Sequence, residues 1–214
     1  MRKLIVWTIL FSAAIFGYSE DQNWTENSIT VKLNDRQSVR IASEIKYRSW
    51  DWAEGVFLKN WVLGYDHKWQ HGIAFGVHYK QELTRKVEGP DLLERRIGLD
   101  ASWGKKTDNG KRFDIRGRLE IRQFDDNAAA DHYRLRIRFR LRDQWRFGNF
   151  RLEPYISMEP FYDTLTDSFA RYRFSVGSMI PLNRYAKLRI AYLRQDRKGR
   201  GPEHVFNTGI SLTF

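Results

Sequence analysis

The sequence of 214 residues contains no cysteine and only five prolines. The absence of cysteine excludes disulfide bonds, thiolate metal sites, a cysteine nucleophile and lipidation of an N-terminal cysteine. Long apolar runs are also missing, apart from residues 4–16, which are too few for a membrane-spanning helix of about 20 residues. Charged residues make up 29% of the chain and aromatic residues 15%, so a folded domain is expected rather than a disordered chain.

The N-terminus has the organisation of a secretory signal peptide. Arg2 and Lys3 precede the apolar run, and residues 17–19 place small side chains at the spacing that a signal peptidase prefers. We interpret residues 1–19 as a cleaved signal peptide and residues 20–214 as one exported domain. Without Arg2 and Lys3, 35 of the 37 basic residues remain against 26 acidic ones, a formal charge of +9. The basic charge therefore belongs to the folded domain.

Period-two alternation of apolar and polar residues recurs from residue 24 to the end of the chain, which predicts an all-β protein. Most of the expected strands are longer than the five or six residues typical of globular proteins and suit tilted membrane strands. Turn residues divide the region into eleven expected strands, at residues 24–34, 38–49, 57–67, 72–82, 92–104, 112–124, 132–145, 149–161, 169–180, 186–196 and 203–214.

The connections between these strands alternate in length. Short turns are expected at residues 34–37, 107–110, 147–149 and 181–184, and Asn109-Gly110 suits a type I′ hairpin. Longer links are expected at residues 49–55, 84–91, 125–131, 163–168 and 196–203. Short turns at one end and long loops at the other are typical of outer-membrane barrels.

Residues 133–142 alternate large apolar side chains with five consecutive even-numbered arginines. In a strand this pattern gives one apolar face and one guanidinium face. Aromatic residues gather near expected strand ends, at Trp69, Trp103, Trp145 and Tyr185 beside short turns and at Trp50, Trp52 and Tyr133 beside long loops. Two such girdles indicate that the apolar face meets lipid. We therefore predict a transmembrane antiparallel up-and-down β-barrel of 10 to 12 strands in the bacterial cell outer membrane.

Two resemblances agree with this prediction. The last strand carries Phe206, Thr208, Ile210, Leu212 and Phe214 on one parity and resembles the C-terminal signal of bacterial outer-membrane barrels, which implies the barrel-assembly machinery as a partner. Residues 116–122 read R-x-R-x-E-x-R. With Trp24-Thr25, Glu94-Arg95-Arg96 and the closing residues 210–214, this motif resembles an uncharacterised family of bacterial outer-membrane β-barrels, a domain of unknown function. That resemblance implies fold and location, and no activity.

The strand count conflicts with the even number usual for bacterial barrels. We expect either ten strands that close from residue 38 to residue 214, with residues 20–34 in or beside the lumen, or twelve strands including one more short strand. Pro154 and Pro160 each remove a ladder donor, so a bulge is expected in the strand at residues 149–161.

If the arginines face inward, they line the lumen together with acids from neighbouring strands. Pairing across a loop centred near Ala128 sets Glu120 opposite Arg136 and Asp114 opposite Arg142. We expect Glu153, on the following strand, to pair with the arginines of residues 133–142 from the other side. The candidate anion-contacting residues are Arg116, Arg118, Arg134, Arg136, Arg138 and Arg140, and their candidate acidic partners are Asp114, Glu120, Glu153 and Glu159.

Two functions are open for this lumen: a small anion-preferring pore or solute-binding channel, and a non-conducting structural barrel filled by an Arg/Glu network. A third class is an outer-membrane lipid-modifying hydrolase, which needs serine and histidine close together. The chain has five histidines and no G-x-S-x-G motif, so no enzyme activity is expected.

The sequence predicts no cofactor and no metal site. His67 and His71 flank a turn, and Asp125, Asp126 and Asp131 lie on one long loop, so we interpret both groups as solvated. Nucleic acid is not an expected partner because arginines that alternate with lipid-facing leucines form no exposed groove. Membrane lipid is the expected environment, and the oligomeric state is left unassigned.

Overall fold

The computed structural model describes residues 21–48, 55–86, 89–125 and 130–214. The expected signal peptide, Trp50, Trp52 and Asp126 lie outside the described residues. The strands are β1 (Asp21–Lys32), β2 (Gln37–Arg48), β3 (Val56–Lys68), β4 (Ile73–Thr84), β5 (Leu92–Lys106), β6 (Arg112–Phe124), β7 (His132–Arg142), β8 (Trp145–Phe147), β9 (Phe150–Asp163), β10 (Ser168–Pro181), β11 (Ala186–Arg197) and β12 (Glu203–Thr213), and one 3₁₀ turn, η1 (Gln70–Gly72), joins β3 to β4.

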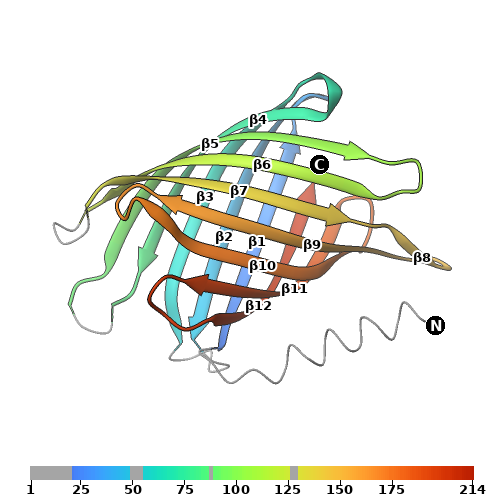
Figure 1. The fold of residues 1–214 in the computed structure, drawn as a ribbon. Coiled ribbons are helices and arrows are strands. Elements are labelled where there is room, and N and C mark those ends of the chain that lie inside the picture. The colour runs from blue at the N-terminus through green and yellow to red at the C-terminus, as the bar shows by residue number, and fades with distance from the viewer. Residues whose placement is uncertain (1–20, 49–54, 87–88, 126–129) are drawn as a thin grey trace.

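Eleven of these strands form a closed barrel, in the order β1 to β7 and then β9 to β12. The three-residue strand β8 pairs with the start of β9 and extends this hairpin beyond the barrel wall. Figure 1 shows the strands of the near wall crossing those of the far wall at a large angle, as expected when all strands tilt in a closed barrel. Within the described residues, no helix has the length and apolar character needed to cross a membrane.

The barrel closes by a parallel pair. Because eleven strands alternate in direction, the first and last run the same way, and β1 pairs in parallel with β12. An even number is required only when every neighbouring pair is antiparallel, so the expectation of ten or twelve strands was wrong. Residues 21–32 lie in the wall as β1, between β12 and β2, and not in the lumen.

All eleven expected strands are present within a few residues of their predicted bounds. The two prolines of β9 coincide with gaps in its ladder with β7. This ladder skips Pro160 and the adjacent Glu159, passing from Arg136–Phe161 to Phe139–Met158, and it ends at Tyr155, next to Pro154. A register shift lies on the facing strand β10, at Phe169 and Arg171. The missing N–H donors explain the gaps in the β7–β9 ladder.

The distribution of polarity is inverted relative to a soluble protein. Large apolar side chains lie exposed along the outer face, including Ile41, Phe75, Leu99, Leu135 and Ile156, which are 42% to 60% exposed. Most of the buried residues are polar or charged, including Lys46, Glu82, Arg96, Glu120 and Gln195. A barrel with an apolar outer band and a polar interior is the arrangement that a bilayer requires.

The two ends of the barrel differ. Short turns join β1 to β2, β3 to β4, β5 to β6, β8 to β9 and β10 to β11, and Gly110 in the β5–β6 turn has the positive φ of 86° that this hairpin requires. Figure 1 shows the turns after β5, β8 and β10 on the same side of the barrel. Exposed Trp69, Trp103 and Tyr185 lie at this end, and Tyr133 lies at the other.

Candidate functional site

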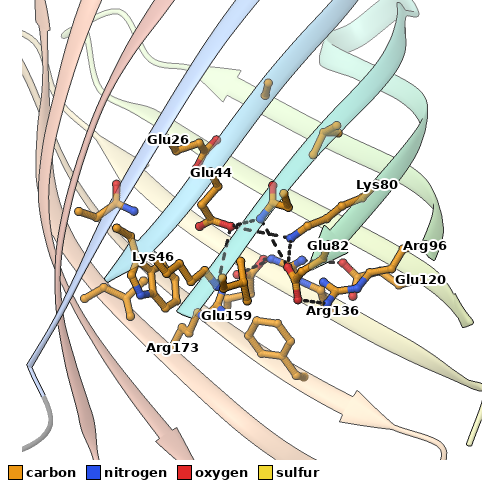
Figure 2. A pocket seen from close by; sticks show the side chains of 18 of the residues that line it. Glu26, Glu44, Lys46, Lys80, Glu82, Arg96, Glu120, Arg136, Glu159 and Arg173 are labelled. Carbon is orange, nitrogen blue, oxygen red and sulfur yellow. Dashed lines mark hydrogen bonds and ion pairs between the residues drawn. The ribbon is translucent and has the colours of Figure 1, made fainter. Parts of the chain in front are cut away.

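The lumen holds a cavity of about 690 Å³ lined by side chains from the barrel strands. Seventeen arginines and lysines and six glutamates line this cavity, an excess of eleven positive charges. Figure 2 shows labelled side chains from several strands that converge on this space. All six arginines proposed from the sequence as anion-contacting residues line the cavity: Arg116, Arg118, Arg134, Arg136, Arg138 and Arg140.

Toward the ends of the strands that carry the longer loops, three glutamates hold a network of cations. Glu82 accepts from Arg96 and Lys80, both at 2.6 Å, and Lys80 also lies 3.8 Å from Glu44. Glu94 binds Arg96 and the Arg122 guanidinium together. Because each carboxylate contacts donors from neighbouring strands, the network ties β2, β4, β5 and β6 to one another.

Three of the predicted acidic partners, Glu120, Glu159 and Asp114, bind arginines of β7. Glu120 is only 1% exposed and accepts from Arg136 at 2.6 Å. Glu159 lies 3.1 Å from both Arg136 and Arg116. Asp114 pairs with Arg142 at 2.6 Å, as the sequence predicted.

The backbone register behind these pairs differs from the expected one. Glu120 lies directly opposite Arg134, and Asp114 lies opposite Arg140, so the two strands are displaced by two residues from the predicted pairing. The long arginine side chains nevertheless reach diagonally along the sheet to the carboxylates, within the range of diagonal cross-strand neighbours.

The predicted role of Glu153 was wrong. Glu153 binds the Lys187 ammonium of β11 at 2.9 Å instead of an arginine of β7. In the β9–β10 ladder, Glu153 is in register with Met179. In the β7–β9 ladder, Tyr155 takes the position opposite Arg142. The interrupted β7–β9 ladder could not be derived from the alternation of residues alone.

Several cavity arginines have no acidic partner. Within the described residues, no carboxylate lies within ion-pairing distance of Arg40, Arg138, Arg140 or Arg171. Arg140 instead packs over the Tyr155 ring at 5.1 Å, and Arg171 packs over the Phe161 ring at 5.5 Å. Both contacts are cation–π interactions, which stabilise a cation without neutralising its charge.

Sequence reasoning missed further cations of the lumen: Lys46, Lys80, Arg96, Arg173 and Arg189. Lys46 and Arg173 both lie over the ring of buried Trp24, at 3.8 Å and 5.0 Å. All five share the parity of lumen-facing residues in their strands, and this parity could have identified them.

Two of the five histidines lie in ion-pair networks. His78 is buried 3.5 Å from Asp100, and Asp100 also binds the Arg118 guanidinium in a bidentate pair. His132 lies 3.3 Å from Asp163. In the described part of the chain, no three histidine or acidic side chains gather in a way that could hold a metal ion.

The family model described as Protein of unknown function (DUF2490) matches residues 21–205. A search of the curated proteins found no significant match. Among solved structures, the chain is similar to LpxR from Salmonella typhimurium, with a TM-score of 0.54, 7% identity and 83% of each chain covered. This likeness concerns the fold.

Two further solved structures match with lower TM-scores. The beta domain of the Bordetella autotransporter BrkA has a TM-score of 0.49 and 8% identity, covering 80% of this chain and 78% of that one. The siderophore receptor PirA from Pseudomonas aeruginosa has a TM-score of 0.35 and 14% identity, covering 83% of this chain and 35% of that one.

Proposed function

The chain belongs to the family described as Protein of unknown function (DUF2490), and because this description assigns no activity, we propose a function from the geometry of the lumen. We propose that the protein is a bacterial outer-membrane β-barrel whose arginine-lined lumen binds small anionic solutes and admits them in preference to cations. The observation that carries this proposal is the excess of eleven positive charges around a cavity of about 690 Å³.

The outer-membrane location is supported by the barrel itself. Its outer face is apolar, its interior is polar, and exposed aromatic residues lie at both ends. Export of the chain by the signal peptide expected at residues 1–19 would deliver it to this membrane. Extraction of the protein only by detergent, with migration on a gel that changes on heating, would support the location. A water-soluble monomer would contradict it.

The charge in the lumen favours anions for a physical reason. Lumen-facing arginines two residues apart on one strand, such as Arg138 and Arg140, are separated by about 7 Å along the chain. At an effective dielectric constant of about 20, two unneutralised charges at that separation repel by about 2 kcal/mol. Because no carboxylate of the described residues forms an ion pair with Arg138 or Arg140, mobile anions are a further counter-charge.

A second cavity of about 230 Å³ lies toward the short-turn end of the barrel. Arg40, Arg116, Arg118 and Arg138 line both cavities, and Asp66 and Asp100 also line the second one. Arginines that line a pore are a means of anion preference.

The second candidate is a non-conducting structural barrel, and the ion-pair network favours it. Buried Glu120 and the shared carboxylates of Glu82 and Glu94 link neighbouring strands across the lumen, which suits a locked wall. Both candidates use the same paired residues. Only the unpaired arginines distinguish the anion-preferring barrel from the structural one, because unneutralised charge does not stabilise a purely structural network.

Planar-bilayer recording tests the proposal. We expect a reversal potential in a salt gradient that indicates anion preference, reduced in Arg138→Gln and unchanged in Arg36→Gln, which alters an exposed turn residue. Cation preference would contradict the proposal. An absence of both conductance and anion binding to the purified barrel would leave the structural barrel as the function.

A further inference from the structure

Four lumen arginines from β2, β6 and β7 line the larger cavity and have one carboxylate partner between them among the described residues. Arg116 of β6 lies directly opposite Arg138 of β7, and Arg140 follows on the same face of β7. Arg40 reaches the same space from β2. We propose that Arg40, Arg116, Arg138 and Arg140 form a binding site for a divalent tetrahedral oxyanion, namely phosphate or a phosphomonoester. This inference rests on the proposed function, because it names the class of anion and its place in the lumen.

The first argument is charge. In the described part of the chain, only Arg116 of these four has a carboxylate partner, Glu159 at 3.1 Å. Glu159 is shared, since it also binds Arg136 at 3.1 Å. The four guanidinium groups therefore have a surplus of about three positive charges over the carboxylates within ion-pairing distance. Arg116 and Arg138 lie directly opposite each other on β6 and β7, and two cations so placed are unfavourable without a counter-anion.

The second argument is hydrogen bonding. The Nε–H groups of Arg40, Arg116 and Arg140 are buried and have no hydrogen-bond partner among the described residues. Buried donors of folded proteins are nearly always paired, and an unpaired one costs about 1 to 3 kcal/mol. These three donors come from strands β2, β6 and β7, and all three arginines line the larger cavity.

The third argument concerns which anion satisfies the cluster. Chloride carries one charge, and a carboxylate offers two oxygens in one plane. A phosphate group carries a charge of about −1.5 to −2 at pH 7 and presents three or more acceptor oxygens in a tetrahedron. Planar guanidinium groups bind such oxygens in a fork, which makes arginine the preferred partner of phosphate where geometry matters. A phosphate group therefore matches both the charge and the donors.

The interrupted β7–β9 ladder explains why this site is open. Arg138 lies in the interruption of the β7–β9 ladder, where the register of the flanking pairs sets it opposite Glu159, next to Pro160. The carboxylate of Glu159 is used by Arg116 and Arg136. The next lumen-facing position of β9, opposite Arg140, is Ser157, which carries no charge. Strand β9 therefore supplies a carboxylate to Arg116 and forms no ion pair with Arg138 or Arg140.

Titration calorimetry of the detergent-purified full-length barrel with sodium phosphate in a chloride background tests the site. The variants are Arg138→Gln and Arg40→Gln, which keep a polar side chain and remove the charge. The matched control is Arg171→Gln, because Arg171 lines the same cavity and also lacks a carboxylate partner. We expect phosphate to bind the wild type more tightly than acetate. Loss of one charged hydrogen-bond donor should weaken phosphate binding about tenfold or more.

Stability supplies a second readout that does not depend on calorimetry. Without phosphate, Arg138→Gln should unfold at the same urea concentration as wild type or a higher one, since it removes repulsion. With phosphate, the wild type should gain stability and Arg138→Gln should gain less. Arg138→Lys, which keeps the charge and loses the fork, should lie between them. Glycerol phosphate binding as well as inorganic phosphate would assign the site to phosphomonoesters, and binding of inorganic phosphate alone would assign it to the free ion.

The outcomes separate the two proposals. Equal weakening in Arg171→Gln and Arg138→Gln would overturn the site, because the effect would then be one of overall lumen charge. Anion preference in bilayers without phosphate binding would overturn the site and leave the proposed function standing. Loss of anion preference altogether would remove the proposed function, and the site with it.

Discussion

Replacing Gly209 with alanine is expected to prevent the β1–β12 seam from closing. A β-carbon at Gly209 would lie 1.8 Å from the carbonyl oxygen of Glu26 on β1. The β1–β12 ladder is interrupted at Gly209, because its pairs pass from Thr25–Thr208 to Ser28–Ser211. The Asn27 side chain accepts the hydrogen bond of the Ile210 N–H there at 3.0 Å. The two strands approach so closely that only glycine fits.

The size of the destabilisation follows from the distance by which β1 and β12 would have to separate. Ordinary contact begins at 3.4 Å, so the strands would have to separate locally by about 1.6 Å. A separation of that size breaks hydrogen bonds of ordinary length. Two lost ladder bonds at about 1 kcal/mol each, with an overpacking cost of about 1 to 3 kcal/mol, give a destabilisation of about 3 to 5 kcal/mol. The ratio of folded to unfolded barrel should fall by a factor of about 100 or more.

Urea unfolding in detergent, followed by tryptophan fluorescence, measures this loss, and heat-modifiable gel migration reports the folded fraction. The matched control is Gly117→Ala, because a β-carbon at Gly117 would meet nothing closer than the Ala101 carbonyl oxygen at 4.0 Å. We expect the control to lie within about 0.5 kcal/mol of wild type. If Gly209→Ala is as stable as Gly117→Ala, then β1 and β12 do not pack at this separation and the parallel closure is incorrect.

Two further predictions concern the lumen and the wall. Glu120→Gln should destabilise the barrel by about 3 kcal/mol, because it removes the buried carboxylate that pairs with Arg136 at 2.6 Å and leaves Arg136 with Glu159 alone. Adding Arg136→Gln should recover part of that loss; strictly additive single effects, measured by urea unfolding, would rule out the coupling. Because the chain has no native cysteine, single labels test the orientation of β7. A fluorophore on Leu135→Cys should be quenched by lipids with brominated acyl chains and one on Arg138→Cys should not, and the reverse pattern would mean that the faces are exchanged.

The strands and their faces could be predicted because the period-two pattern is local. Alternation in residues 133–142 identifies both a strand and its two faces without knowledge of any neighbour. Leu135 and Leu141 are more than 40% exposed on the outer face, and Arg134 is buried inside. Each strand bound was accurate to a few residues for the same reason, since turn residues mark the ends.

Register and closure could not be predicted because they depend on strands far apart in sequence. A two-residue shift between β6 and β7 exchanges the directly opposed partner of Glu120 and keeps every side chain on its face, so the alternation cannot detect it. The parallel seam joins residues about 180 positions apart. Gly209 and Asn27 allow the close approach at this seam, but their role can be recognised only when β1 and β12 are known to be neighbours.

The arginines of β7 show how one repeated pattern yields two roles. Arg134, Arg136 and Arg142 each bind a carboxylate, at 2.7 Å, 2.6 Å and 2.6 Å. Arg138 and Arg140, between them, have none in the described chain. The difference comes from the neighbouring strand, where Pro160 interrupts the ladder and Ser157 takes the position opposite Arg140. An aspartate at position 157 would give Arg140 a partner on the neighbouring strand; with serine there, the unpaired charge of Arg140 is available to a solute.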